Sequence, residues 1–138
     1  LIYGLREALR LLREEGLDNV FARHIRHGEA TRRAVRTWGL DILCLDPEEY
    51  SPVLTAVVMP GGKGADAYRE AVLEKFNMSL GNGLGILKDR VFRIGHLGDF
   101  NDLMLIGTLG GVEMGFALKG VPYKQGGVMA ALDYLAAN

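Results

Sequence analysis

The sequence predicts an α+β domain in which a small, mostly antiparallel sheet of three to four strands is covered by helices. Two patterns predict this class: apolar residues at helical spacing near both ends of the chain, and short runs of branched residues in the middle. Size is the third observation, because 138 residues suffice for one domain with a buried core. The expected order is helix, helix, strand, strand, helix, strand, strand, helix, helix.

An amphipathic helix is expected over residues 1–16. Its apolar positions share one face at a spacing of four and three residues, and they are Leu5, Leu9 and Leu12. Gly16 then provides a typical stop signal. The chain starts at Leu1 inside this helical pattern and shows none of the segments of a signal peptide. We therefore expect the chain to be a piece of a longer polypeptide.

A second helix is expected from about Asp18, a favourable N-cap, to Gly39. Apolar residues recur along it, namely Val20, Phe21, Ile25, Val35 and Trp38. Its many arginines alternate with acids, which is typical of surface ion pairs. His24 and His27 have a spacing that suits a metal ion, with Glu29 nearby, but no third ligand of matching geometry is visible. We therefore expect no metal site and place both histidines on a solvated helix face.

The middle of the chain predicts the strands. Runs rich in branched residues cover 41–45, 53–59 and 90–95, and a short extended segment begins at residue 78. A helix over 65–76 separates the second of these runs from the extended segment. Cys44 lies in the first run without a basic neighbour, which favours an inert thiol in the core.

Two further helices are expected at the C-terminal end, over 103–120 and about 126–137. Asn101 or Asp102 is the expected N-cap of the first. Between residues 103 and 118 this helix has one charge, Glu113, and glycine recurs at every fourth position, at Gly107, Gly111 and Gly115. The run is short for a membrane span. We expect a buried helix whose glycine face packs against the sheet or a neighbouring domain.

Composition excludes several classes of protein. Apolar residues make up 49% of the chain, charged residues 24%, and the formal net charge is -1, values typical of soluble globular proteins. We therefore expect neither a nucleic-acid partner nor a membrane span. The single cysteine cannot form an internal disulfide, and the cytoplasm is the expected location.

Arg93 is the residue least expected in a buried strand, because it is a lone cation between apolar neighbours. Side chains alternate along a strand, so Arg93 points away from the face shared by Phe92 and Ile94. It lies either on an open sheet face in water or in a cleft whose other wall is not part of this chain. The planar guanidinium binds a carboxylate through two parallel hydrogen bonds, which favours a carboxylate site.

The glycine-rich stretch GNGLG, residues 81–85, has two interpretations. It lacks the spacing of a dinucleotide-binding turn. Its glycines serve either flexible turns or the close approach of the backbone to a ligand.

The stretch MSLGNGLGILKDRVFRIGHLGDFNDLMLIGTLGGVEMG, residues 78–115, resembles part of a known enzyme family. It is similar to the C-terminal part of class V, fold-type I pyridoxal-phosphate aminotransferases of the alanine-glyoxylate, serine-glyoxylate and serine-pyruvate group. The most specific element is a glycine-rich loop, a spacer, then RIG-x-LG and a capped helix. Residues 1–24 resemble the helical segment that leads out of the large domain in that group.

The resemblance implies a domain organisation and a set of site residues. Residues 1–16 would lead from a missing large domain, and residues 17–138 would form the α+β body of a C-terminal small domain that closes over the substrate. Arg93 stands where the family motif places the arginine that binds the α-carboxylate of the amino or oxo acid. Gly83 and Gly85 would lie at the mouth of the same cleft, and His96 would be in a position to tune substrate choice.

The resemblance also implies a cofactor and a reaction. Family members bind pyridoxal phosphate as a Schiff base to a lysine of the large domain, and no lysine of this chain has a matching context. The parent enzyme would be a homodimer that transfers an amino group from serine or alanine to glyoxylate or pyruvate, and this chain alone would have no catalytic residue and no activity. The alternative is a free-standing α+β module that binds ligands or proteins without catalysis. Upstream sequence encoding a large domain with a Schiff-base lysine would decide for the enzyme.

Overall fold

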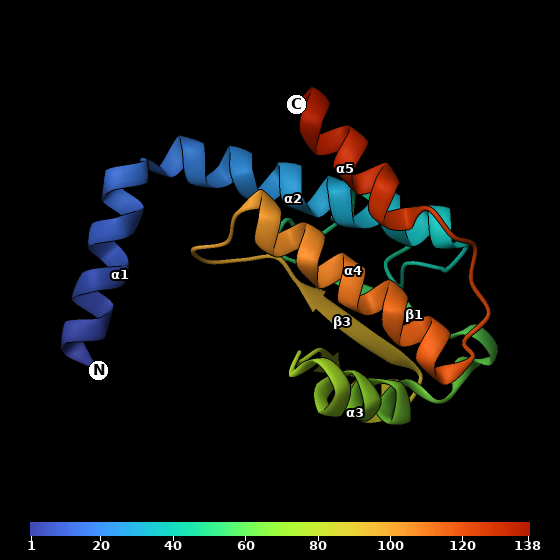
Figure 1. Cartoon of the computed structure of the whole chain (residues 1–138). Coiled ribbons are helices and arrows are strands. Elements are labelled where there is room, and N and C mark those ends of the chain that lie inside the picture. The colour runs from blue at the N-terminus through green and yellow to red at the C-terminus, as the bar shows by residue number, and fades with distance from the viewer.

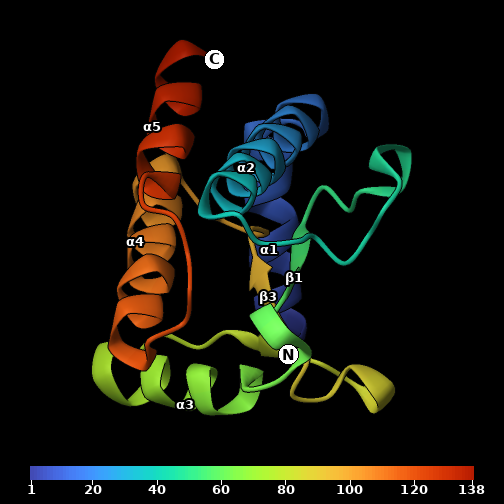
Figure 2. The same cartoon turned by 90° about the vertical axis from the view of Figure 1, so that its right-hand side faces the viewer.

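The structure, a computed structural model, describes residues 1–138 and confirms the α+β class. Its sheet has three antiparallel strands, with β3 (Val91–Gly95) between β1 (Leu54–Val58) and β2 (Gly81–Asn82). In Figure 1, α4 lies in front of the sheet, α2 and α5 lie above it, and α3 lies below it. The opposite face, to the right in Figure 2, carries loops with short 3-10 turns and no α-helix. The α-helices therefore leave this face of the sheet uncovered.

Helices α1 (Ile2–Glu15) and α2 (Leu17–Trp38) are separated by Gly16, which has a φ of 83°. Glycine reaches this left-handed region without steric cost, and the chain changes direction there, so α1 projects away from the body (Figure 1). α1 buries none of its residues, and its apolar face is exposed. The expected N-cap at Asp18 is wrong, because α2 begins at Leu17 directly after Gly16.

α2 buries three of the five apolar residues expected along it, Val20, Val35 and Trp38, but not the other two. Phe21 and Ile25 are exposed, whereas His24 and His27 are buried. The two histidines lie on one helix stripe with buried Val20, Thr31 and Val35. The expectation of a solvated histidine face is therefore wrong, because this stripe faces the body of the domain. The expected ion pairs are present further along, where Glu29 pairs with three arginines, Arg32, Arg33 and Arg36.

The run at 41–45 is not a strand, and this expectation is wrong. Only Ile42 forms a bridge, to Val57. The chain then turns, because Pro47 begins a short 3-10 helix that the Asp46 side chain caps by accepting the Glu48 N–H. Cys44 is consequently half-buried outside the core, and its thiol donates to the Asp46 carbonyl at 3.4 Å.

Three helices follow β1: α3 (Ala65–Phe76), α4 (Asp102–Lys119) and α5 (Gly127–Ala137). Asn101 is the N-cap of α4, as expected, and its side chain accepts the Met104 N–H at 2.9 Å. Two of the three glycines expected to form a packed face, Gly111 and Gly115, pack on Met78 and on α3 rather than on the sheet, whereas Gly107 is exposed. A Cβ at Gly115 would lie 2.5 Å from Val72, and one at Gly111 would lie 2.8 Å from Met78. The close helix contact is therefore limited to the C-terminal half of α4.

The core is a single cluster of 19 buried residues between the helices and the sheet. Phe116 of α4 lies at its centre, with its ring 5.2 Å from both Tyr68 and Trp38 and 6.0 Å from Phe92. The Trp38 indole N–H donates to Glu113 at 2.8 Å. None of the helices combines the length and the apolar character that crossing a bilayer requires.

Candidate substrate-carboxylate site

Arg93 lies in the middle strand on the face of the sheet that carries no helix. Phe92 and Ile94 are fully buried, while Arg93 is half-buried on the other face, as the alternation predicted. Its guanidinium makes no hydrogen bond or ion pair within the chain, and its Nε is buried without a partner. Burying an unpaired donor of a charged group is costly. The site therefore favours an anion supplied from outside the chain.

Two small residues flank Arg93 across the sheet. Ala56 of β1 and Gly81 of β2 are its direct partners in the two strand pairings, and directly opposite residues share one face. We call Ala56, Arg93 and Gly81 the arginine row. A Cβ at Gly81 would lie 3.0 Å from both Cβ and Nε of Arg93, so the arginine side chain lies against Gly81. Both direct cross-strand partners of Arg93 are therefore small.

The positions of Gly81 and Ala56 beside Arg93 could not be predicted from the sequence. Gly81 belongs to the glycine-rich stretch 81–85, which was the only available signal, but the strand register that sets it beside Arg93 is not encoded in any motif. The predicted cleft residue Gly83 is instead buried where a Cβ would overlap the carbonyl of Leu87. Gly85 is exposed, with a φ of 54° at the start of a tight turn. The local backbone of this chain therefore accounts for a glycine at both positions without a ligand.

His96 lies on the opposite side of the sheet from Arg93. It is fully buried, and its Nε2 lies 3.0 Å from the hydroxyl of Thr55, which belongs to the helix-covered face. Burial, with a smaller effect of the nearby Arg32 charge, lowers the pKa of His96 to about 4. The imidazole is therefore neutral at pH 7, and the structure does not bring it to the arginine row.

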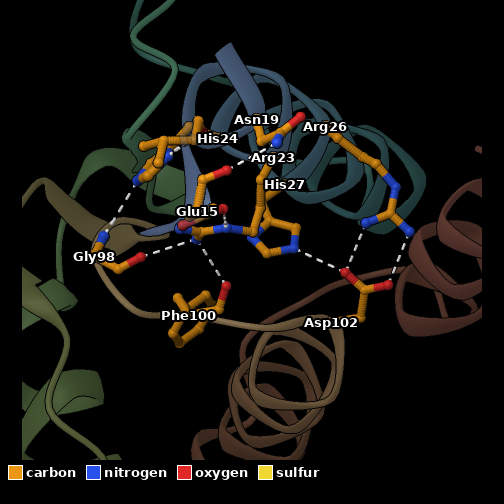
Figure 3. A network of polar contacts seen from close by, with 10 residues as sticks. Glu15, Asn19, Arg23, His24, Arg26, His27, Gly98, Phe100 and Asp102 are labelled. Atoms are coloured by element: carbon orange, nitrogen blue, oxygen red, sulfur yellow. Dashed lines mark hydrogen bonds and ion pairs between the residues drawn. The ribbon is translucent and has the colours of Figure 1, made fainter. Parts of the chain in front are cut away.

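The loop after β3 is attached to α2 by polar side chains (Figure 3). Arg23 donates from Nη1 to the carbonyls of Gly98 and Phe100 at 2.8 and 2.9 Å. Its Nε and Nη2 donate to the carboxylate of Glu15 at 2.6 and 2.8 Å. The Gly98 N–H donates to Nε2 of His24 at 3.2 Å. One arginine therefore joins the end of α1 to this loop.

A second part of the network joins α2 to the start of α4. Arg26 donates to both oxygens of Asp102 at 2.7 and 2.8 Å, and Nε2 of His27 lies 2.9 Å from Oδ1 of Asp102 (Figure 3). These bonds, led by that of Arg26, lower the pKa of Asp102 to about 2. Burial lowers the pKa of His27, so its neutral ring donates to the carboxylate. Sequence reasoning missed this network because its members lie about 75 residues apart.

Comparisons with known proteins connect this geometry to an enzyme family. No protein-family model matches the chain. The chain is 47% identical over 139 residues to the serine-glyoxylate aminotransferase of Methylorubrum extorquens, which covers 100% of this chain and 35% of that protein. It is 50% identical over 138 residues to the serine-glyoxylate aminotransferase of Arabidopsis thaliana, and this match covers 98% of this chain and 34% of that protein.

A solved structure supports the same relationship. The crystal structure of ureidoglycine-glyoxylate aminotransferase from Bacillus subtilis matches with a TM-score of 0.90 at 31% identity, covering 97% of this chain and 35% of that one. The chain thus spans about a third of the length of the curated relatives it matches. By sequence and by fold, it belongs to the class V aminotransferases and corresponds to their C-terminal domain.

Proposed function

We propose that this chain is the substrate-binding C-terminal domain of a pyridoxal-phosphate-dependent aminotransferase that uses serine or alanine as donor and glyoxylate or pyruvate as acceptor. The observation that carries the proposal is the unpaired, half-buried guanidinium of Arg93 on the helix-free face of the sheet. The names of the three relatives described above share glyoxylate, and the donor they name is serine in two and ureidoglycine in one. Glyoxylate is therefore the better supported acceptor.

Arg93 binds what donor and acceptor have in common. An amino acid and a 2-oxo acid both carry a carboxylate next to the reacting carbon, so one arginine serves both halves of the reaction. The fork of the guanidinium binds this group with two hydrogen bonds, each worth about 1.5 to 3 kcal/mol. Gly81 and Ala56 leave room for the substrate beside the fork. The role of Arg93 is thus to fix the orientation of the bond that reacts.

Pyridoxal phosphate, when bound, supplies the electron sink of the reaction. We assign no catalytic or cofactor-binding residue to this chain. Its lysines are all exposed, namely Lys63, Lys75, Lys88, Lys119 and Lys124. The arginine row fits a substrate carboxylate placed beside a cofactor that other polypeptide holds. The helix leading from a large domain at residues 1–16, the homodimer and the cytoplasmic location belong to the same proposal.

The first test replaces Arg93 by lysine in the parent enzyme. A lysine keeps the charge but loses the planar fork. We expect KM for the amino acid to rise and kcat/KM to fall by about tenfold or more, while the absorbance of bound cofactor stays unchanged. Arg90→Lys is the matched control, because Arg90 lies just before β3 and is exposed. An unchanged kcat/KM for the amino-acid half-reaction in Arg93→Lys would remove Arg93 from this role.

The second test uses the 138-residue chain alone. Mixed with pyridoxal phosphate and reduced with borohydride, it should yield no stoichiometric adduct at any one lysine. Peptide mass spectrometry measures the adduct at each lysine. A full adduct at a single lysine would place the cofactor on this chain and contradict the proposal.

A further inference from the structure

The direction of α1 depends on Gly16, on an ion pair of Glu15, and on the Asn19 side chain, which donates to the Glu15 carbonyl at 2.8 Å. α1 buries no residue, and Gly16 lies between it and α2 with φ 83° and ψ 134°. At the end of α1, both carboxylate oxygens of Glu15 accept bonds from Arg23. The side chains of this pair are 33% and 21% exposed, so water screens the pair less than a fully exposed one. The Glu15 carboxylate is therefore the acidic group that ties the end of α1 to α2.

The loop over residues 97–100 depends on side chains of α2 for its shape. None of its backbone groups bonds to another backbone group: the nearest such bonds are His96 N–H to Val53 before it and Leu105 N–H to Asn101 after it. Its hydrogen bonds are those that Arg23 donates to two carbonyls and the one that the Gly98 N–H donates to His24. At its far end, Phe100 packs against the core, with its ring edge-on to that of His27 at 6.0 Å. Without these hydrogen bonds, the part of the loop before Phe100 is free to take other conformations.

Arg23 binds both partners with one rigid group. The guanidinium is planar, and its two edges have a fixed relative orientation. Nε and Nη2 face Glu15, and Nη1 faces the carbonyls of Gly98 and Phe100 (Figure 3). A rotation of α1 about Gly16 that moves Glu15 therefore turns or releases the edge that holds the loop.

We propose that Arg23 is a positioning residue that couples the direction of α1 to the conformation of the loop 97–100. This loop begins two residues after the end of β3, the strand that carries Arg93. A displacement of α1 relative to the body is thereby transmitted to the end of the substrate-binding strand. That consequence for the substrate rests on the proposed function, whereas the coupling itself does not.

The test is a double-mutant cycle read by amide hydrogen exchange at Gly98 in the 138-residue chain, without substrate or cofactor. Glu15→Gln removes the carboxylate and leaves every direct contact of the loop in place. We expect it to speed exchange of the Gly98 amide by roughly fivefold, because Arg23 loses the partner that orients it. In the Arg23→Gln background, Glu15→Gln should have no further effect on Gly98.

Glu7→Gln is the matched control, because it removes another carboxylate of α1 that pairs only within that helix, with Arg10. It should leave Gly98 exchange unchanged. The coupling is overturned if Glu15→Gln also leaves it unchanged, or if its effect persists in the Arg23→Gln background. Slow amide exchange in α4 verifies that each variant is folded. If Arg23→Gln unfolds the chain, Arg23→Lys takes its place, because an ammonium group lacks the two hydrogen-bonding edges of the guanidinium. The exchange rate of the Gly98 amide tests the coupling whether or not the Arg93→Lys kinetics support the proposed function.

Discussion

At the scale of single residues, Gly81 determines where the guanidinium of Arg93 lies. The φ of Gly81 is not positive, so alanine fits the backbone there without strain. Its methyl group would lie 3.0 Å from Cβ and Nε of Arg93, which is too close, and the arginine side chain must move. Alanine at residue 81 should therefore change substrate binding and leave the stability of the fold nearly unchanged.

We therefore expect Gly81→Ala in the parent enzyme to raise KM for the amino acid by about three- to tenfold, with a change in unfolding free energy below about 1 kcal/mol. Steady-state kinetics and urea unfolding measure the two quantities. Gly110→Ala is the control, because a Cβ there meets no atom within 4 Å. An unchanged KM in Gly81→Ala would show that the arginine row tolerates the methyl group.

His96 gives the fold a dependence on pH. The folded pKa is about 4 because the ring is buried, and the unfolded value is about 6.5. Between these values the unfolded chain binds more protons, so the contribution is complete above about pH 6.5 and is lost as pH falls toward 4. We expect His96→Asn to flatten the decline of unfolding free energy over this range in urea titrations. A decline as steep as that of the wild type would contradict this assignment.

Two neighbouring residues also contribute to acid sensitivity. The lowered pKa of His27 acts in the same direction as that of His96, so some decline should remain in His96→Asn. The pKa of Asp102 is about 2, below the unfolded value of about 3.9. Its contribution is therefore lost only at more acidic pH, where Arg26 loses its charged partner.

At the scale of elements, we expect alanine at two glycines of α4 to change the unfolding free energy in opposite directions. A Cβ at Gly115 would lie 2.5 Å from Val72 of α3, whereas one at Gly107 meets nothing within 4 Å. Gly115→Ala should lower the unfolding free energy by about 1 to 3 kcal/mol through overpacking. Gly107→Ala should raise it by up to about 1 kcal/mol through helix propensity. Urea unfolding measures both, and equal signs would show that α3 and α4 do not pack closely.

The position of Glu113 explains why an apolar helix carries a charge. Its carboxylate accepts the indole N–H of Trp38 and the backbone N–H groups of Gly126 and Val128. The first N–H groups of α5 have no partner within their own helix. Glu113 therefore supplies, from α4, the cap that the sequence around Gly126 lacks.

The sequence predicts those elements whose local pattern is strong. Helical spacing identifies all five helices, and the alternation around Arg93 gives the correct face. The run at 41–45 was misread because propensity alone does not show that Pro47 and Asp46 end the extended segment. The burial of His24 and the pairing of Gly81 with Arg93 depend on contacts across 74 and 12 residues. No local pattern carries that information.

At the scale of the whole molecule, α1 is an appendage to a complete core. It contributes no member to the core cluster, and its apolar face is exposed to solvent. An exposed apolar stripe promotes association between molecules. The body over residues 17–138 therefore owes its stability to contacts that exclude α1.

We expect deletion of residues 1–14 to change Tm by less than about 3 °C and to reduce self-association of the chain. The deletion retains Glu15 and its pair with Arg23. Calorimetry measures Tm, and sedimentation velocity measures association. A fall of about 10 °C or more would show that α1 stabilises the body.

The fluorescence of the buried Trp38 indole reports on the helix-covered side of the sheet and not on the side that carries Arg93. Trp38 is the only tryptophan, it is 1% exposed, and it lies between α2 and α4 on the helix-covered side. Arg93 lies on the other side of the sheet. Intrinsic fluorescence should therefore shift to longer wavelength when the core opens and remain unchanged when an anion occupies the arginine row. A titration of substrate analogues followed at this emission would report unfolding alone.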